Sequence, residues 1–387
     1  MKVYLDNAAT TPVDKQVLDE MLPYLTEHFG NPSSIHGYGR KAKAAVEKAR
    51  KTVARYLNAS TSEVFFTGSG TEANNMVIKC AVRDLGVKRI ISSRIEHHCV
   101  LYSAQVIANS NQGVLVDYVK LDKQGRVDLN DLESLLINNS GKTLVSLMHA
   151  NNEIGTMLNL GKIAELCTRY EAYFHSDTVQ TIGYFPFDVQ KTKIHFLSGS
   201  AHKFYGPKGV GFVYINTEAP FKPFLDGGSQ ERNMRAGTEN VSGIAGLGKA
   251  LEVATELMQE NKEKIQELKK YMIACLSKEI DGIFFIGDIS DEGSNYKVLS
   301  VSLPPDEKSE LMLMNLDMAG VAASGGSACS SGSEKGSHVL EAINADPKRK
   351  VIRFSFSKYN TKQEIDYTIS VLKKVMAPSS LKSAITE

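Results

Sequence analysis

The chain has 387 residues, of which 42% are hydrophobic and 23% are charged, and its formal net charge is +1. This balance is typical of a soluble globular protein and excludes the extended charged surface expected for nucleic-acid binding. The length predicts two or three domains.

The chain contains five widely spaced cysteines without a C-x-x-C pair: Cys80, Cys99, Cys167, Cys275 and Cys329. This pattern argues against a disulfide framework and a structural metal site, so we expect no bound metal and a reducing, cytoplasmic setting. The first residues, MKVYLDNAATTP, lack the apolar stretch of a signal peptide, and no later run reaches the roughly 18 apolar residues of a membrane span. We therefore expect an unprocessed soluble protein with no membrane partner.

Two helices are predicted near the N-terminus, over residues 14–29 and 38–57, where apolar residues recur at helical spacing. Runs rich in β-branched and aromatic residues then alternate with amphipathic stretches. These runs are residues 63–67, 89–93, 114–119, 144–149 and 173–177. The alternation predicts an α/β fold in which a mostly parallel sheet carries crossover helices on both faces.

Polar residues cluster directly after the predicted strands. The clusters are residues 67–71, 96–97, 150–153, 177–180 and 198–203. In open parallel sheets ligands bind outside the carboxyl ends of the strands. We therefore expect the five clusters to form one site.

The character of the chain changes after a long charged helical region at residues 242–276, which we expect to connect two domains. Strands at residues 297–303 and 351–357 alternate cleanly, as expected for a small antiparallel sheet with one solvated face. Residues 324–337 between them are rich in glycine and serine, which predicts a mobile loop. We expect a large domain of residues 14–255 and a smaller α+β domain of residues 1–13 and 256–387.

Lys203 follows the apolar run IHFLS and precedes the glycine turn GPKG, so it is predicted to lie at the edge of the sheet. A lysine whose pKa is lowered by burial or by another cation can form an imine, and pyridoxal phosphate is its commonest partner. A surface lysine in a loop would show the same short pattern.

Residues 68–73, GSGTEA, open a predicted helix and can hold a phosphate with backbone N–H groups. They also fit the dinucleotide fingerprint G-x-G-x-x-A. That fingerprint expects an acidic residue after the next strand, where this chain has Ser92, Ser93 and Arg94. The dinucleotide interpretation is therefore the weaker one.

Asp177 ends a predicted strand, where a buried carboxylate can keep a pyridine nitrogen protonated, with Gln180 in reach of the ring oxygen. Asp177 would serve equally well as a helix N-cap. His97 and His98 precede Cys99, but adjacent residues rarely face one metal ion, so we expect one histidine to contact a ring and the other to be a bystander.

Cys329 lies in the loop rich in glycine and serine, where an exposed thiol can act as a mobile nucleophile, whereas Cys80 and Cys167 have the pattern of buried thiols. Arg353 is either a surface charge or a fork that binds a substrate carboxylate through two hydrogen bonds.

Taken together, these segments resemble the cysteine desulfurases, pyridoxal-phosphate enzymes of the class V aminotransferase group with fold type I. The resemblance runs from Tyr4 to Asp366. Seven motifs carry it: FTGSGTEANN (66–75), EHH (96–98), HANNEIG (149–155), HSDTVQ (175–180), SAHKFYGPKGVG (200–211), MRAGTEN (234–240) and SGGSACSSGS (324–333). The chain departs from the pattern at Ala201, where many relatives have glycine, and in the unusual serine and glycine content after Cys329.

The resemblance implies that Lys203 forms the Schiff base with the cofactor, that His97 stacks on its ring, and that Asp177 partners the pyridine nitrogen. Asn152 and Gln180 would contact the phenolic oxygen of the ring.

Phosphate contacts are implied for Thr71, Ser200 and His202. A threonine matching Thr238 reaches the phosphate of the neighbouring subunit's cofactor, which implies a homodimer with shared sites.

The implied substrate is L-cysteine, with Arg353 on its carboxylate and Asn7 and Asn152 nearby. Cys329 would accept the sulfur as a persulfide, release L-alanine, and pass the sulfur to an acceptor or scaffold protein in iron–sulfur cluster or thio-cofactor assembly. The alternatives are a selenocysteine lyase, and an aminotransferase or decarboxylase on the same scaffold. A catalytically silent regulator is a further alternative, but no cofactor residue is missing from the sequence.

Overall fold

The central sheet of the protein is built from strands of the N-terminal two thirds of the chain. The computed structural model describes residues 1–110, 113–138, 141–305, 311–325 and 336–376. Among these residues, seven strands form one sheet: β2 (Val64–Thr67), β3 (Arg89–Ser92), β4 (Leu115–Tyr118), β5 (Thr143–Ser146), β6 (Tyr173–Asp177), β7 (Phe196–Ser200) and β8 (Gly211–Ile215).

The order of the strands in this sheet is β2-β8-β7-β6-β5-β3-β4. The neighbours from β7 to β4 pair in parallel, and β8 runs antiparallel to both of its neighbours. Because β8 reverses direction, β2 runs the same way as β7. The carboxyl ends of β2, β3, β5, β6 and β7 therefore lie at one edge, and the predicted mostly parallel α/β sheet is confirmed.

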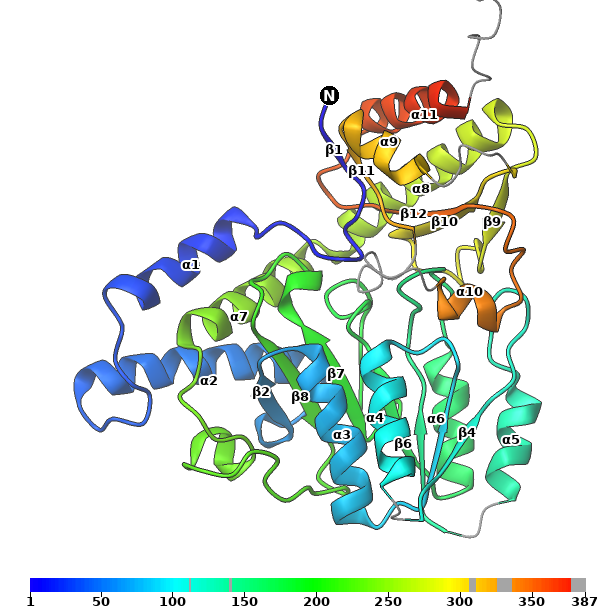
Figure 1. Ribbon diagram of the computed structural model, residues 1–387. Coiled ribbons are helices and arrows are strands. Elements are labelled where there is room, and N and C mark those ends of the chain that lie inside the picture. The colour runs from blue at the N-terminus through cyan, green and yellow to red at the C-terminus, as the bar shows by residue number, and fades with distance from the viewer. Residues whose placement is uncertain (111–112, 139–140, 306–310, 326–335, 377–387) are drawn as a thin grey trace, which may run out of the picture.

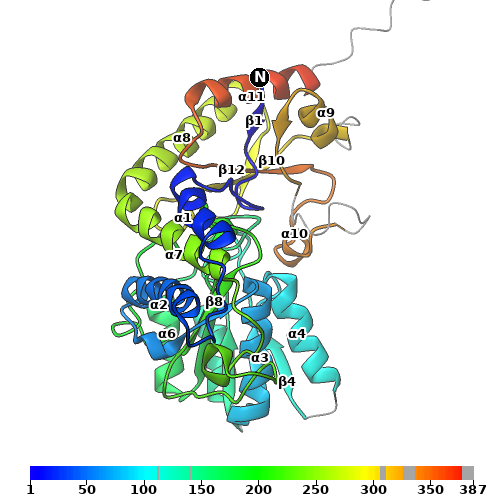
Figure 2. The same cartoon turned by 90° about the vertical axis from the view of Figure 1, so that its left-hand side faces the viewer.

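Helices cover both faces of the central sheet (Figure 1). They are α1 (Lys15–Thr26), α2 (Gly37–Leu57), α3 (Gly70–Leu85), α4 (His98–Asn109), α5 (Leu129–Ile137), α6 (Leu160–Arg169) and α7 (Val241–Glu256). Alternate side chains of each strand point to opposite faces. Phe65 and Ile90 accordingly pack with α3 and α4, while Phe66 and Ile91 pack with α2, α6 and α7. Figure 2 shows α1, α2 and α7 stacked beside one another.

The start of α3 is determined by local hydrogen bonds. The Ser69 side chain accepts a bond from the backbone N–H of Glu72 at 3.2 Å, and the Glu72 carboxylate accepts one from Gly68 N at 2.9 Å. A Cβ atom on Gly70 would lie 2.5 Å from the Val179 side chain, so only glycine fits here. The helix therefore begins tightly against the turn that follows β6.

A smaller sheet lies above the carboxyl edge of the central sheet (Figure 1). Its antiparallel order is β12 (Val351–Ser355), β10 (Val298–Ser302) and β9 (Phe284–Ile286), and β1 (Val3–Tyr4) pairs with β11 (Val321–Ala322) beside it. The accompanying helices are α8 (Met258–Glu279), α9 (Met312–Met318), α10 (His338–Ala342) and α11 (Lys362–Met376).

The prediction that this smaller sheet has one solvated face is wrong, because every residue of β10 and β12 is buried. The alternation itself is present: Leu299 and Ile352 pack in the hydrophobic core, and polar residues occupy the other face. The N-terminal segment covers that polar face, where Ser355 Oγ accepts a hydrogen bond from Ala8 N at 2.8 Å. Protein groups thus replace water as hydrogen-bond partners.

The charged helical region predicted at residues 242–276 consists of two helices, α7 and α8, which meet at Leu257. Most of α7 is buried, and the charged residues belong mainly to α8. The division into domains of residues 14–255 and of residues 1–13 plus 256–387 stays a prediction. None of the described helices is both long and apolar enough to cross a membrane.

Candidate active site

A cavity of about 250 Å³ lies at the carboxyl edge of the central sheet, beneath the N-terminal segment and β12. Each of the five polar clusters supplies part of its lining. The cluster residues are Ser69, Gly70, Thr71, His97, Asn152, Asp177, Val179, Gln180, Ser200, His202 and Lys203, and they are joined by Ala8, Ala9, Asn74, Cys99, Met148 and Arg353. The five clusters that were predicted to form one site therefore line one cavity at this edge of the sheet.

Lys203 ends a short 3₁₀ turn, Ala201–Lys203, that directly follows β7. Its Nζ donates hydrogen bonds to the carbonyl oxygens of Ala8 and Ala9, both at 2.7 Å. The Tyr184 hydroxyl donates to the Lys203 carbonyl oxygen at 2.8 Å. The amine is therefore held at the cavity wall by the N-terminal segment, and its backbone is held by a buried tyrosine.

Asp177, at the end of β6, is fixed by a chain of buried side chains. Asn74 Nδ2 donates to Asp177 Oδ2 at 2.7 Å, and Asn74 Oδ1 pairs with His175 Nε2 at 3.1 Å. His175 Nδ1 pairs in turn with Ser146 Oγ at 2.8 Å. Because the amide oxygen only accepts, His175 Nε2 carries the proton. Asp177 Oδ1 accepts a hydrogen bond from Val179 N at 3.0 Å. Asp177 therefore caps the turn that follows β6, and not a helix as the alternative interpretation expected.

His97 caps α4 and faces the cavity. Its Nδ1 accepts a hydrogen bond from Cys99 N at 3.2 Å and lies 3.0 Å from Cys99 Sγ. Burial lowers the pKa of His97, and the nearby Lys203 charge lowers it further, against the opposite effect of Asp177. The ring is therefore neutral near pH 7 and carries its proton on Nε2. The neighbouring His98 instead stacks on Tyr102, with ring centroids 5.0 Å apart, as expected of a bystander.

The end of the cavity nearest α3 is suited to an anion. Thr71 lies in the first turn of α3, where backbone N–H groups lack helical partners and the helix dipole is positive. Ser200 and His202 line the same cavity. Burial lowers the pKa of His202 to about 4, so this ring is neutral, and its Nδ1 lies 3.1 Å from Thr10 Oγ1.

Arg353 is 2% exposed and extends from β12 to the cavity. Its Nη2 forms an ion pair with Asp6 Oδ1 at 2.6 Å, and its Nη1 donates to the Asn152 carbonyl oxygen at 2.9 Å. Its Nε has no hydrogen-bond partner among the described residues. Asn7 is fully buried beside this group but does not line the cavity, and its Nδ2 donates to Ser355 O at 2.8 Å.

Two cavity residues thus carry buried polar atoms that have no partner in the described part of the chain, Arg353 Nε and Gln180 Oε1. Gln180 Nε2 donates to the Ala8 carbonyl oxygen at 3.0 Å. Unpaired buried polar atoms beside a lysine, a carboxylate and a helix N-terminus suit a ligand with a carbonyl, a ring nitrogen and a phosphate. The residues present therefore fit pyridoxal phosphate.

Thr238, like Asn7, is a predicted site residue that does not line this cavity. It is exposed in the segment before α7. Cys329 lies outside the described residues. No group of three or more His, Cys, Asp or Glu side chains that could hold a metal occurs in the described part of the chain.

Sequence reasoning missed the roles of Asp6, Ala8, Asn74 and Cys99. Asn74 lies inside the motif FTGSGTEANN, so its place in a quoted motif was a usable signal. The partner of Asp6 is 347 residues away along the chain, and no local pattern indicates that contact.

Comparisons with known proteins agree along most of the chain. The aminotransferase class-V family matches residues 3–368. A cysteine desulfurase IscS of Dictyoglomus turgidum is 43% identical over 379 residues, which cover 97% of this chain and 94% of that protein. The solved structure of a NifS-like protein has a TM-score of 0.89 at 37% identity and covers 97% and 99% of the two chains. The structure of SspA in complex with cysteine has a TM-score of 0.78 at 30% identity, with 93% and 100% covered.

Proposed function

Since the chain belongs to the aminotransferase class-V family, we propose that it is a pyridoxal-phosphate-dependent cysteine desulfurase that converts L-cysteine to L-alanine. The observation that carries the proposal is the cavity in which Lys203, Asp177 and Arg353 meet. The resemblance to cysteine desulfurases is confirmed, because a relative of that name is 43% identical over almost the whole chain. Pyridoxal phosphate as the cofactor follows from the same family.

Lys203 would hold the cofactor covalently, and Asp177 would keep a proton on its ring nitrogen. Asn74 orients the Asp177 carboxylate. His97, which lines the cavity, would stack on the ring, and Asn152 and Gln180 would contact its oxygen. Thr71, Ser200 and His202 would bind the phosphate at the start of α3. When bound, pyridoxal phosphate supplies an electron sink for the electrons that a broken Cα–H bond leaves behind.

The substrate carboxylate is assigned to Arg353, with Asn152 and Asn7 on the same side of the site. A guanidinium binds a carboxylate through two parallel hydrogen bonds, and Arg353 Nε is a donor in need of an acceptor. Before the substrate binds, the ion pair with Asp6 holds the Arg353 guanidinium in its orientation. When the substrate binds, its carboxylate replaces part of that contact. Once the substrate amine has taken its place on the cofactor, the free Lys203 amine would accept the Cα proton as general base.

Cys329 is assigned as the sulfur acceptor. Its thiolate attacks the sulfur atom of the substrate, the substrate carbon–sulfur bond breaks, and a new sulfur–sulfur bond forms on the enzyme. The former cysteine carbon takes a proton, so the products are L-alanine and a Cys329 persulfide. A selenocysteine lyase is the less favoured alternative, because the similar proteins are cysteine desulfurases or hold cysteine.

The proposed partners are a second copy of this chain and a sulfur-acceptor or cluster-scaffold protein. Thr238 is exposed and absent from the lining of its own cavity, which supports its assignment to the phosphate of a partner subunit in a homodimer. Free thiols at Cys80, Cys99, Cys167 and Cys275 support a reducing, cytoplasmic setting.

The test is a comparison of Cys329→Ala with Cys275→Ala, a thiol on α8 remote from the cavity lining. Both variants and the wild type should show a change in cofactor absorbance when L-cysteine is added. Only Cys329→Ala should lose the release of L-alanine and, with a thiol reductant, of sulfide. Full L-cysteine desulfuration by Cys329→Ala would refute the persulfide route.

A further inference from the structure

Asp6, in the N-terminal segment, supplies the counter-ion of the buried Arg353. Asp6 Oδ1 lies 2.6 Å from Arg353 Nη2, and the side chains of Asp6 and Arg353 are 20% and 2% exposed. Nη1 of the same group donates to the Asn152 carbonyl oxygen, and Nε has no partner among the described residues. The protein therefore neutralises the charge of Arg353 with its own carboxylate, but it leaves one donor of the guanidinium unused.

The backbone around Asp6 is fixed to the strand that carries Arg353. Asp6 forms a bridge with Ser355, which lies two residues after Arg353 in β12. In this bridge Asn7 N donates to Ser355 O at 3.3 Å, and Ser355 N donates to Leu5 O at 2.7 Å. Because these bonds flank the ion pair, the Asp6 backbone stays beside Arg353 when a ligand enters the cavity.

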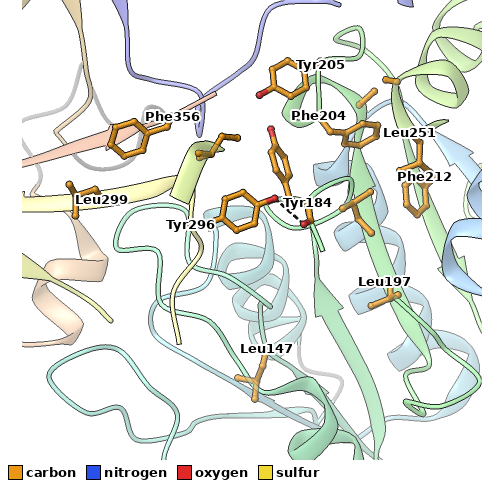
Figure 3. Close-up of a cluster of buried hydrophobic side chains, with 14 of the residues drawn as sticks. Leu147, Tyr184, Leu197, Phe204, Tyr205, Phe212, Leu251, Tyr296, Leu299 and Phe356 are labelled. Carbon is orange, nitrogen blue, oxygen red and sulfur yellow. Dashed lines mark hydrogen bonds between the residues drawn. The ribbon is translucent and has the colours of Figure 1, made fainter. Parts of the chain in front are cut away.

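The strand β12 is itself held in the hydrophobic core. Phe354 in the strand and Phe356 directly after it are both fully buried. Figure 3 shows Phe356 and Leu299 of β10 in the cluster of buried hydrophobic side chains. The guanidinium of Arg353 and the carboxylate of Asp6 are therefore both attached to firmly packed backbone.

A ligand carboxylate at Arg353 has to share the guanidinium with Asp6. The group has five N–H donors but a single positive charge. A second carboxylate can therefore find a donor, but it is repelled by the first carboxylate across a few ångströms. Because Asp6 is only 20% exposed, solvent screens that repulsion incompletely. Asp6 should therefore weaken the binding of any carboxylate at Arg353.

We propose that Asp6 is a positioning residue that acts through Arg353: it holds the guanidinium in place and competes with the ligand carboxylate, so that the product L-alanine leaves the site readily. The proposal rests on the proposed function, which places the amino-acid carboxylate on Arg353. In the empty site the same contact spares the protein a buried charge without a partner. Since substrate and product carry the same carboxylate, Asp6 weakens the binding of both.

The decisive variant is Asp6→Asn, whose amide oxygen can keep the hydrogen bond to Arg353 Nη2 while the negative charge is removed. Asp6→Asn holoenzyme should bind L-alanine about 5- to 10-fold more tightly than wild type, at the low end of typical couplings between two sites. Its affinity for L-alaninamide, which lacks the carboxylate charge, should stay unchanged. A merely structural role predicts the opposite sign, because the loss of a structural contact would weaken the binding of L-alanine.

Calorimetric titration of the holoenzymes with both ligands measures these affinities. Asp6→Glu keeps the charge and should not bind L-alanine more tightly than wild type. The matched control is Asp14→Asn, because Asp14 pairs with Lys358 at 2.5 Å and does not line the cavity. Equal or weaker binding of L-alanine by Asp6→Asn, or equal tightening for L-alaninamide, would overturn the inference and leave the desulfurase assignment intact. A wild type that binds neither L-alanine nor L-cysteine would overturn both.

Thermal unfolding provides a second readout that does not depend on turnover. Without ligand, Asp6→Asn should have a lower Tm than wild type, because the buried Arg353 loses its counter-ion. Saturating L-alanine should narrow this Tm gap, because the ligand carboxylate then becomes the counter-ion. Asp6→Ser, a second neutral variant, should behave in the same way. A Tm gap of the same size with and without L-alanine in both variants would refute the competition between Asp6 and the ligand.

Discussion

Glu96, next to the ring-stacking candidate His97, provides a test of the electrostatics of the site. Its side chain is 1% exposed, and its Oε1 accepts hydrogen bonds from Ser93 Oγ at 2.8 Å and Met148 N at 2.9 Å. Burial raises the pKa of the Glu96 carboxyl from 4.5 to about 8. The perturbation is Glu96→Gln, which can keep both hydrogen bonds through its amide oxygen and removes the titration.

The sign of the effect follows from proton binding. Unfolded chains release the Glu96 proton near pH 4.5, whereas the folded protein holds it up to about pH 8. The folded state therefore binds more protons between these values, and its stability falls as pH rises through that window. Between pH 5 and pH 8 the two pKa values correspond to a loss on the order of 3 kcal/mol. For a chain of 387 residues this loss lowers Tm by about 4 °C.

The assay is thermal unfolding of wild type and Glu96→Gln at pH 5 and pH 8, with the exposed residue Glu165 on α6 changed to Gln as control. Wild type and Glu96→Gln share all other titrating groups, so the contributions of those groups cancel when the Tm values of the two proteins are subtracted. Glu96→Gln should gain stability relative to wild type by about 4 °C more at pH 8 than at pH 5. If the Tm difference between Glu96→Gln and wild type is the same at pH 5 and pH 8, the conclusion that the buried Glu96 carboxyl keeps its proton is refuted.

Two further predictions concern ligands. Arg353→Lys should raise KM for L-cysteine on the order of 10- to 100-fold, because a lysine cannot form two parallel hydrogen bonds to a carboxylate. The cofactor absorbance should stay normal. An unchanged KM in steady-state kinetics would contradict the assignment of Arg353 to the substrate carboxylate. Thr238→Ala should lose cofactor faster on dialysis without a change in Tm, because Thr238 is exposed and stands outside its own cavity. Sedimentation should show a dimer, and a monomer that retains its cofactor normally would count against the shared site.

Much of the site follows from local sequence patterns. Apolar runs that alternate with amphipathic stretches predict parallel strands, and parallel strands end at one edge whatever their order. For this reason the placement of Lys203, Asp177 and His97 around one cavity was predictable before any contact was known. The start of α3 was predictable in the same way, because GSGTEA encodes a capped helix N-terminus.

Only the tertiary structure decided which distant groups complete the site. Asp6 and Arg353 form an ion pair across 347 positions, and the carbonyl oxygens of Ala8 and Ala9 hold the Lys203 amine. The clean alternation in β10 and β12 predicted a solvated face, yet every residue of both strands is buried, and the N-terminal segment covers their polar face through the bond from Ala8 N to Ser355 Oγ. A sequence period shows which residues share a face. Whether that face meets water or protein depends on how separate elements dock, and docking depends on surfaces distributed over the whole chain.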